Sequence, residues 1–364
     1  MASLLHRSLS CSARLTTGLT RGLTRGLTRG LTKGLTTEAA ATTALIEDWT
    51  NRMKQVSIHD TDTVSASTQQ LLAMTIHPLS LALDREAAAK QLSSSPCYEA
   101  LRQLPPSGSA VRAGSHFTLF PLRTPEPLLA IDGYDTDWSP PSPFVQRMWA
   151  GGDIQWMPHN PLCVGETVTQ TTRMQDAVLK PTGRGHAMFV TIAKDISNQA
   201  GVAVKELRSY VYLENKPEAA PAAVNAKRSI KNTLESDFQT TVLPTTASLF
   251  RFSALTFNSH LIHYDHNYAS IKEGYDGCLV HGPMTCSLLL DHFRRNAPNK
   301  TIRRFTYRAI SAVFVGRPLT LHGQWAVQSS DGKAYCKLWA TNEKGSIAMK
   351  GTLEFETSLL PYCV

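Results

Sequence analysis

The chain has 364 residues, of which 42% are hydrophobic and 18% are charged, and its formal net charge is +8. No apolar run is long enough to cross a bilayer, which argues against a membrane-spanning protein. Residues 1–37 hold six basic and no acidic residues, so removing those six from 37 leaves 31 basic against 29 acidic residues. The remainder carries only +2, which removes the electrostatic reason to expect a nucleic-acid partner.

Residues 18–36 repeat the unit Gly-Leu-Thr-Arg with slight decay, so that leucines and basic residues each recur every four positions. On a helix these two series lie on opposite faces, roughly 200° apart. An acid-free amphipathic segment rich in Arg, Ser and Thr is typical of a mitochondrial transit peptide. Residues 1–37 are therefore predicted to direct the protein to the mitochondrial matrix. The alternative is a low-complexity tail, since the glycines weaken a helix.

The next elements are predicted from spacing and composition. Residues 42–54 have apolar positions at helical spacing behind a threonine cap, and a second helical stretch follows around residues 63–74. From His116 onward β-branched and aromatic residues are frequent, which predicts strands. A stretch rich in Pro and Ala predicts a linker over residues 216–235. The linker would separate an amino-terminal domain, residues 38–215, from a carboxyl-terminal domain, residues 236–364.

A short segment recurs on the two sides of that linker. A Val-Gly pair and a later Thr within residues 156–169 coincide with the same residues within 307–320, at a shift of 151 positions. Three coincidences are weak support, but each segment enters a strand that precedes another long strand. The pattern favours two copies of one α+β domain.

In the second half, residues 248–257 are predicted to form a strand that leads into a polar segment with one Asn and three His, followed by a helical turn near residues 265–271. His281-Gly282-Pro283 is predicted to open a helix, because a proline costs least near the first helical position. Four strands are then expected, at residues 305–315, 319–328, 334–342 and 346–356. One helix followed by an antiparallel meander predicts a sheet wrapped around its central helix.

The polar segment resembles the signature of the MaoC-like hot-dog hydratases and dehydratases, Gly-Asp-x-Asn-Pro-x-His. Asn258, His260 and His263 hold the places of its Asp, Asn and His. The surrounding sequence is similar to a subgroup that contains fungal mitochondrial hydroxyacyl-thioester dehydratase type 2 and mesaconyl-C4-CoA hydratases. The similar residues include Glu273-Gly274-Tyr275, Val280 to Pro283 and the run Arg147 to Gly152. The resemblance covers most of residues 40–364. It implies an α+β double hot-dog, two antiparallel sheets each around a central helix, in which a degenerate first domain builds the acyl tunnel.

The resemblance also implies a reaction, the (3R)-3-hydroxyacyl-thioester dehydration of type II fatty acid synthesis, on acyl-CoA or acyl carrier protein thioesters and without a cofactor. Asn258 stands where the wider family has aspartate and cannot take a proton, so its predicted role is to orient water. His263 is then the predicted acid and base. Backbone N–H groups near Gly282 are predicted to stabilise the enolate oxygen, because a helix start favours negative charge.

The remaining site residues each have two readings. His260 and His281 are predicted to contact substrate, but His260, like His266, can be a hydrogen-bonded structural residue, and His281 can simply position the helix start. Arg303 and Arg304 are predicted to contact the phosphates of CoA or of a carrier's pantetheine arm, against the alternative of a solvated basic surface. The histidine spacing could suggest a metal, but no zinc-protease carboxylate accompanies it, so no metal is predicted.

Three other functions stay open. The same fold could hydrate a short branched dicarboxyl-CoA such as mesaconyl-C4-CoA, which an extra basic residue in the acyl pocket would favour. A hot-dog thioesterase would cleave the thioester with water. A non-catalytic acyl-binding protein is the third alternative, because the first half lacks a counterpart of Asn-x-His-x-x-His. A homodimer is the assembly considered, and the seven unpaired-looking cysteines predict a reducing compartment without disulfides.

Overall fold

A computed structural model describes residues 42–80, 85–93, 96–182, 185–214, 230–326 and 333–357. The predicted transit peptide and residues 216–229 of the predicted linker lie outside them. Residues 1–49 and residues 50–364 are separate units, and all elements from β1 onward belong to the second. A helix spans residues 42–53, as predicted. In the described part of the chain, no helix has both the length and the apolar character needed to cross a membrane.

The first half contains short helices followed by four long strands. The predicted second helix is α2, and the Ser65 hydroxyl accepts the N–H of Thr68 at its start. Strands were expected from His116, but the first strand after that residue begins at Phe144, because six prolines between residues 121 and 143 remove backbone donors. The elements are β1 (Ser57–Thr63), α2 (Ala66–Ile76), η1 (His77–Ser80), α3 (Arg85–Ser93), α4 (Pro96–Arg102), η2 (Ser115–Thr118), η3 (Glu126–Leu128), β2 (Phe144–Trp156), β3 (Thr167–Thr182), β4 (Gly185–Asn198) and β5 (Gly201–Glu214).

In the second half, the strand expected over residues 248–257 is wrong, since these residues belong to helix α5. Thr245 and Ser248 form a capping box, and Leu249 and Phe252 are buried at helical spacing while Phe250 is 70% exposed. The aromatic residues favour a strand, but the capping box satisfies the backbone N–H groups at the start of a helix and stabilises it. The elements are β6 (Phe238–Val242), α5 (Thr246–Thr256), η5 (Leu261–His263), η6 (Tyr268–Lys272), α6 (Gly282–Asn296), β7 (Lys300–Ala309), β8 (Leu319–Trp325), β9 (Ala334–Thr341) and β10 (Ile347–Thr357).

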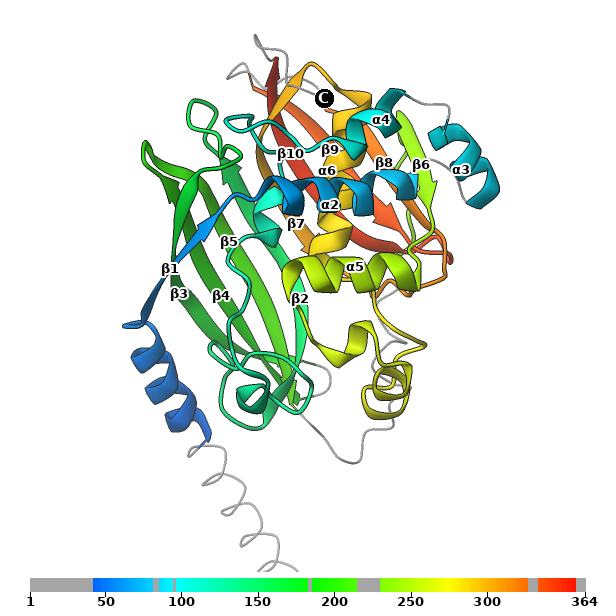
Figure 1. Cartoon of the computed structure of the whole chain (residues 1–364). Coiled ribbons are helices and arrows are strands. Elements are labelled where there is room, and N and C mark those ends of the chain that lie inside the picture. The colour runs from blue at the N-terminus through cyan, green and yellow to red at the C-terminus, as the bar shows by residue number, and fades with distance from the viewer. Residues whose placement is uncertain are drawn as a thin grey trace, which may run out of the picture. The chain divides into compact units, whose positions relative to one another are not determined.

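All ten strands form one antiparallel sheet in the order β1-β3-β4-β5-β2-β7-β10-β9-β8-β6 (Figure 1). The order of the second five mirrors that of the first five, so the two expected sheets are joined edge to edge through β2 and β7. At this junction a Cβ on Gly151 would lie 2.3 Å from the Tyr307 carbonyl oxygen, and φ at Gly151 is 148°. Glycine is therefore needed where the two halves meet.

The predicted internal repeat is confirmed by matching backbone hydrogen bonds. The N–H of Gly165 donates to Val64 O, and 151 residues later the N–H of Gly316 donates to Pro244 O, both at 2.8 Å. The incoming segments match as well, since Val111 N–H donates to Leu162 O and Val280 N–H donates to Val313 O. Residues 111–114 thus hold the place in the first half that residues 280–283 hold in the second.

This correspondence shows how the two halves differ. In the second half the chain continues from that place into α6, a 15-residue helix whose Met284, Leu289 and Phe293 are fully buried. Each such side chain stabilises the fold by about 2 kcal/mol through removal of apolar surface from water. In the first half the chain makes only η2, four residues long, and then runs irregularly to β2. A long segment, residues 119–143, is thereby free to lie elsewhere.

Candidate functional site

The polar segment begins where α5 ends. Phe257 ends that helix in a left-handed conformation, with φ at 51°. The Asn258 side-chain oxygen accepts the backbone N–H of His260 at 3.0 Å, which is an Asx turn. One lone pair of this oxygen is engaged, and the two amide hydrogens of Asn258 can hold an oxygen atom of a bound molecule.

His263 lies buried beside the start of α6, and its Nδ1 is 2.8 Å from the Leu279 carbonyl oxygen. A carbonyl can only accept, so Nδ1 carries the proton and Nε2 keeps its lone pair. Burial, and then the neighbouring His281 and His260, hold the pKa of His263 well below its ordinary value. The imidazole is therefore uncharged at neutral pH. It can accept a proton through Nε2 and, because its pKa is lowered, releases that proton readily.

His281 stacks on His263 with ring centroids 3.7 Å apart and planes 21° apart. The Ser253 hydroxyl is 2.8 Å from His281 Nε2, while Nδ1 is buried without a hydrogen-bond partner. Burial, together with His260, lowers the pKa of His281 to about 3. It is the N-cap of α6 without a side-chain cap bond, so it lies at the helix start, and its contact with substrate stays a prediction.

Gly282 is the first residue of α6, and Trp149 from β2 lies directly against it. A Cβ at Gly282 would lie 2.7 Å from Cγ and 2.8 Å from Cδ1 of the indole. Trp149 is held in turn by Tyr210, edge-on at 5.5 Å, and by Arg208, whose guanidinium carbon is 4.8 Å from the indole centroid. Residues of the first half of the chain thus cover the amino-terminal end of α6. At this end the helix dipole favours negative charge.

Sequence reasoning missed two residues that the structure brings to this cluster. Asp132 Oδ2 lies 3.3 Å from His260 Nε2, and the Arg147 guanidinium carbon lies 3.3 Å from the centroid of the Tyr134 ring. Burial alone would raise the pKa of Asp132, but the hydrogen bond to His260 and the charges of His260 and Arg147 lower it. Asp132 lies in the proline-rich segment that replaces a long helix, and an Asp-Gly turn was its only local signal.

Arg303 and Arg304 lie near the start of β7, a few residues after the carboxyl-terminal end of α6. Arg304 pairs with Asp153 across the β2–β7 junction, with its Nε 2.8 Å from Oδ1, and Arg303 pairs with Glu356 on β10. Their guanidinium groups are thus held by protein carboxylates, and Arg304 remains half-exposed. In the described part of the chain, no group of three or more His, Cys, Asp or Glu side chains is arranged to hold a metal ion.

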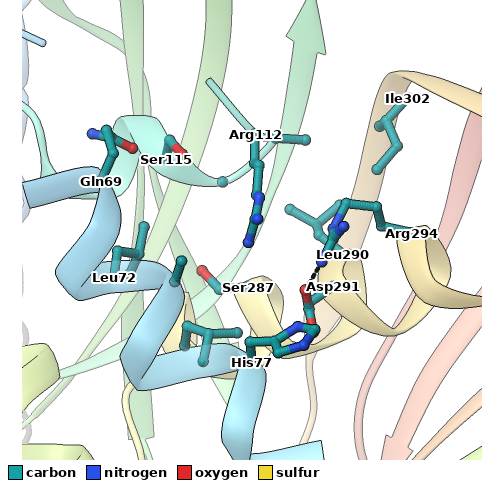
Figure 2. A pocket seen from close by; sticks show the side chains of 14 residues that line it. Gln69, Leu72, His77, Arg112, Ser115, Ser287, Leu290, Asp291, Arg294 and Ile302 are labelled. Carbon is teal, nitrogen blue, oxygen red and sulfur yellow. Dashed lines mark hydrogen bonds and ion pairs between the residues drawn. The ribbon is translucent and has the colours of Figure 1, made fainter. Parts of the chain in front are cut away.

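A pocket lies further along α6, between that helix, α2 and residues 112–115 (Figure 2). Its cavity volume is about 60 Å³, which is room for only a few water molecules. Ser287, Leu290 and Arg294 line it from successive turns of α6, and Leu72 lines it from α2. It begins six residues after His281, about 9 Å along the helix, and is therefore separate from the imidazole cluster.

Solved structures share this architecture. A MaoC-like dehydratase superposes with a TM-score of 0.58 at 12% identity, covering 84% of this chain and 99% of its own. A Mycobacterium tuberculosis protein described as having a double hotdog fold superposes with a TM-score of 0.51 at 15% identity, covering 83% and 96%. The α+β double hot-dog prediction is confirmed. By its fold this chain is a double hot-dog protein, with His260, His263 and His281 buried together.

Sequence comparison gives the family. The profile of hydroxyacyl-thioester dehydratase type 2 matches residues 114–315, and the chain belongs to this family, whose activity is dehydration or hydration of acyl thioesters. Mesaconyl-C(4)-CoA hydratase of Chloroflexus aurantiacus is 33% identical over 225 residues, covering 60% of this chain and 78% of the relative. Mitochondrial hydroxyacyl-thioester dehydratase type 2 of Schizosaccharomyces pombe is 29% identical over 240 residues, covering 58% and 77%.

Proposed function

We propose that the protein is a (3R)-3-hydroxyacyl-thioester dehydratase, working reversibly on acyl carrier protein or CoA thioesters in mitochondrial type II fatty acid synthesis. The observation that carries this is His263, whose Nδ1 is tied to the Leu279 carbonyl so that Nε2 presents a lone pair beside the start of α6. The family supplies the thioester chemistry, and a mitochondrial relative at 29% identity agrees with the compartment.

The chemistry needs one proton carrier and one anion site. His263 Nε2 takes the α-proton, and the electron pair moves toward the thioester oxygen, which the N–H groups at the start of α6 stabilise. The pair then forms the double bond, the C3–O bond breaks, and His263 returns its proton to the departing oxygen as water leaves. The Asn258 amide hydrogens hold that oxygen in line, since its side-chain oxygen is engaged with His260.

The test is hydration of crotonyl-CoA by protein lacking residues 1–37, followed at the enoyl-thioester absorbance, with chiral analysis of the product. His263→Ala should lower the rate by at least 100-fold, because general acid–base catalysis by one group contributes about 10²–10⁴. His266→Ala is the matched control, since this exposed imidazole lies three residues further on. Equal rates for wild type and His263→Ala would overturn the assignment. Free thiol released from the substrate would indicate a thioesterase instead.

A second candidate function, hydration of a short dicarboxyl-CoA such as mesaconyl-C4-CoA, is favoured by Arg147. This residue comes from β2 and lies against Tyr134 close to the imidazoles, and the charge of Asp132 acts on it. Among the described residues, no carboxylate forms an ion pair with it. A guanidinium so placed can receive a substrate carboxylate in a bidentate hydrogen bond.

Substrate selectivity separates the two candidates. If Arg147 binds an acyl carboxylate, Arg147→Met should lower kcat/KM for mesaconyl-C4-CoA by at least 30-fold relative to crotonyl-CoA, since a charged hydrogen bond contributes about 2 kcal/mol. Arg304→Met is the control, because any contact with CoA phosphates is common to both substrates. An unchanged ratio after Arg147→Met would show that Arg147 does not bind an acyl carboxylate and would remove the observation that favours this second function.

The domain and targeting assignments belong to the same proposal. The first half, residues 38–215, would build the acyl tunnel. The second half, residues 236–364, would supply the imidazoles, and residues 216–235 would form the linker between them. Residues 1–37 would act as the transit peptide. Fusion of residues 1–37 to a fluorescent protein should direct it to mitochondria, and replacing the six basic residues by Gln should leave the fusion in the cytosol.

A further inference from the structure

We propose that Asp132 is a positioning residue of the site, which orients His260 to hold the hydroxyl or water of the reaction. It would supply, from the first half of the chain, the carboxylate that the wider family carries at the position of Asn258. This inference rests on the proposed function for the role of His260, while the contact between the two residues is a feature of the structure alone.

The contact is specific in its atoms. Asp132 Oδ2 lies 3.3 Å from His260 Nε2, and both side chains are largely buried, 17% and 7% exposed. A carboxylate can only accept, so it favours the tautomer of His260 in which Nε2 carries the proton and Nδ1 keeps its lone pair. The other carboxylate oxygen, Oδ1, accepts the N–H of Tyr134 at 3.0 Å, which fixes the direction of the carboxylate.

The backbone of Asp132 is also fixed on the histidine segment. Leu261 N–H donates to the Asp132 carbonyl oxygen at 2.8 Å, and the Ser259 hydroxyl donates to the Gly133 carbonyl oxygen at 2.5 Å, over a separation of 126 residues. Gly133 has φ at 78°, and a Cβ there would lie 2.4 Å from the Ser259 carbonyl oxygen. Only glycine permits this approach, so the segment is built to place Asp132 at His260.

The arrangement gives the two imidazoles different tasks. His263 is held by a carbonyl and carries the proton between the α-carbon and the hydroxyl oxygen. His260, 5.7 Å away between ring centroids and nearly perpendicular, accepts the hydrogen of that hydroxyl at Nδ1 and keeps its proton on Nε2. No proton is transferred to His260, so the reaction stays balanced with His263 as the only carrier. A carboxylate that fixes a tautomer in this way raises kcat rather than substrate affinity.

The kinetic test replaces Asp132→Asn, which keeps the size and removes the charge. We expect kcat for crotonyl-CoA hydration to fall 10- to 100-fold with KM within threefold. Asp137→Asn is the matched control, the same substitution at an exposed position of the same segment, and should leave both constants unchanged. Asn258→Asp in the Asp132→Asn background should restore at least part of kcat, because it returns a carboxylate to the same histidine segment.

The split between kcat and KM separates positioning from a merely structural effect. His260 is faced by Asp132, Tyr134, His263 and His281. A variant that only loosens the fold should change KM and the free energy of unfolding together with kcat, whereas loss of the positioning carboxylate should change kcat alone. A fall in kcat accompanied by an equal rise in KM, or kcat within twofold of wild type, would overturn the proposal.

A measurement without substrate keeps the inference separate from the proposed function. Nitrogen-15 shifts of histidine-labelled protein, assigned with His260→Gln, report which ring nitrogen of His260 carries the proton. The wild type should show the Nε2-protonated tautomer, and Asp132→Asn should lose that preference. An Nδ1-protonated His260 in the wild type would refute the positioning role even in an active enzyme. Conversely, an Nε2-protonated His260 in a protein inactive on every thioester would leave the pairing supported and the proposed function wrong.

Discussion

Replacement of Gly282 by alanine tests whether the first half of the chain holds the start of α6. The added Cβ would lie 2.7 Å and 2.8 Å from two atoms of Trp149, whereas ordinary contacts begin at 3.4 Å. The indole would have to move by about 0.7 Å, and it is packed against Tyr210 and Arg208. Overpacking of this kind costs about 1–3 kcal/mol, and better helix propensity returns up to about 1 kcal/mol. We therefore expect a net loss of about 1–2 kcal/mol in the free energy of unfolding.

Urea unfolding, followed by circular dichroism and by tryptophan fluorescence, measures this loss. Crotonyl-CoA hydration by the same sample should fall at least tenfold, since the helix start would be displaced from the thioester oxygen. Ser287→Ala is the control on the same helix, because its buried hydroxyl has no hydrogen-bond partner and its removal adds no atom. Stability and activity both equal to wild type in Gly282→Ala would refute the packing argument.

Two further predictions concern buried titratable side chains in the same unit. Burial lowers the pKa of His116 to about 4 and that of His281 to about 3, so the unfolded chain binds protons first as the pH falls. The free energy of unfolding should hold above about pH 6.5 and fall from there toward pH 4, by about 3 kcal/mol for His116 alone; a profile equally steep in His116→Gln would contradict this. Glu206 binds Arg208 through two hydrogen bonds of 2.8 Å with its carboxylate buried, so Glu206→Gln should cost about 3–5 kcal/mol. Unchanged thermal unfolding of that variant would show that the pair contributes nothing.

Local sequence signals predicted the second half well wherever one element decides its own structure. Proline after His281-Gly282 marked the start of α6, and the bounds expected for β8 to β10 agree with the structure within three residues. Strand β7 begins five residues and ends six residues earlier than expected. The Val-Gly echo identified the repeat, because both glycines occupy left-handed turns at equivalent places, with φ at 88° and 74°. The prediction failed at α5, where aromatic residues that favour strands lie behind a capping box.

The sequence by itself determined the two-fold repeat, the central helix and the Asn258-to-His263 segment, since each depends on residues close together in the chain. Only the tertiary structure decided what surrounds those imidazoles. The helix of the first half stops after η2, and the chain freed by that stop carries Asp132 to His260 and leads into the strand that places Arg147 and Trp149 at the site. Such contacts join residues more than a hundred positions apart, and no local pattern encodes them, because the pairing of β2 with β7 creates them only when the two halves close into one sheet.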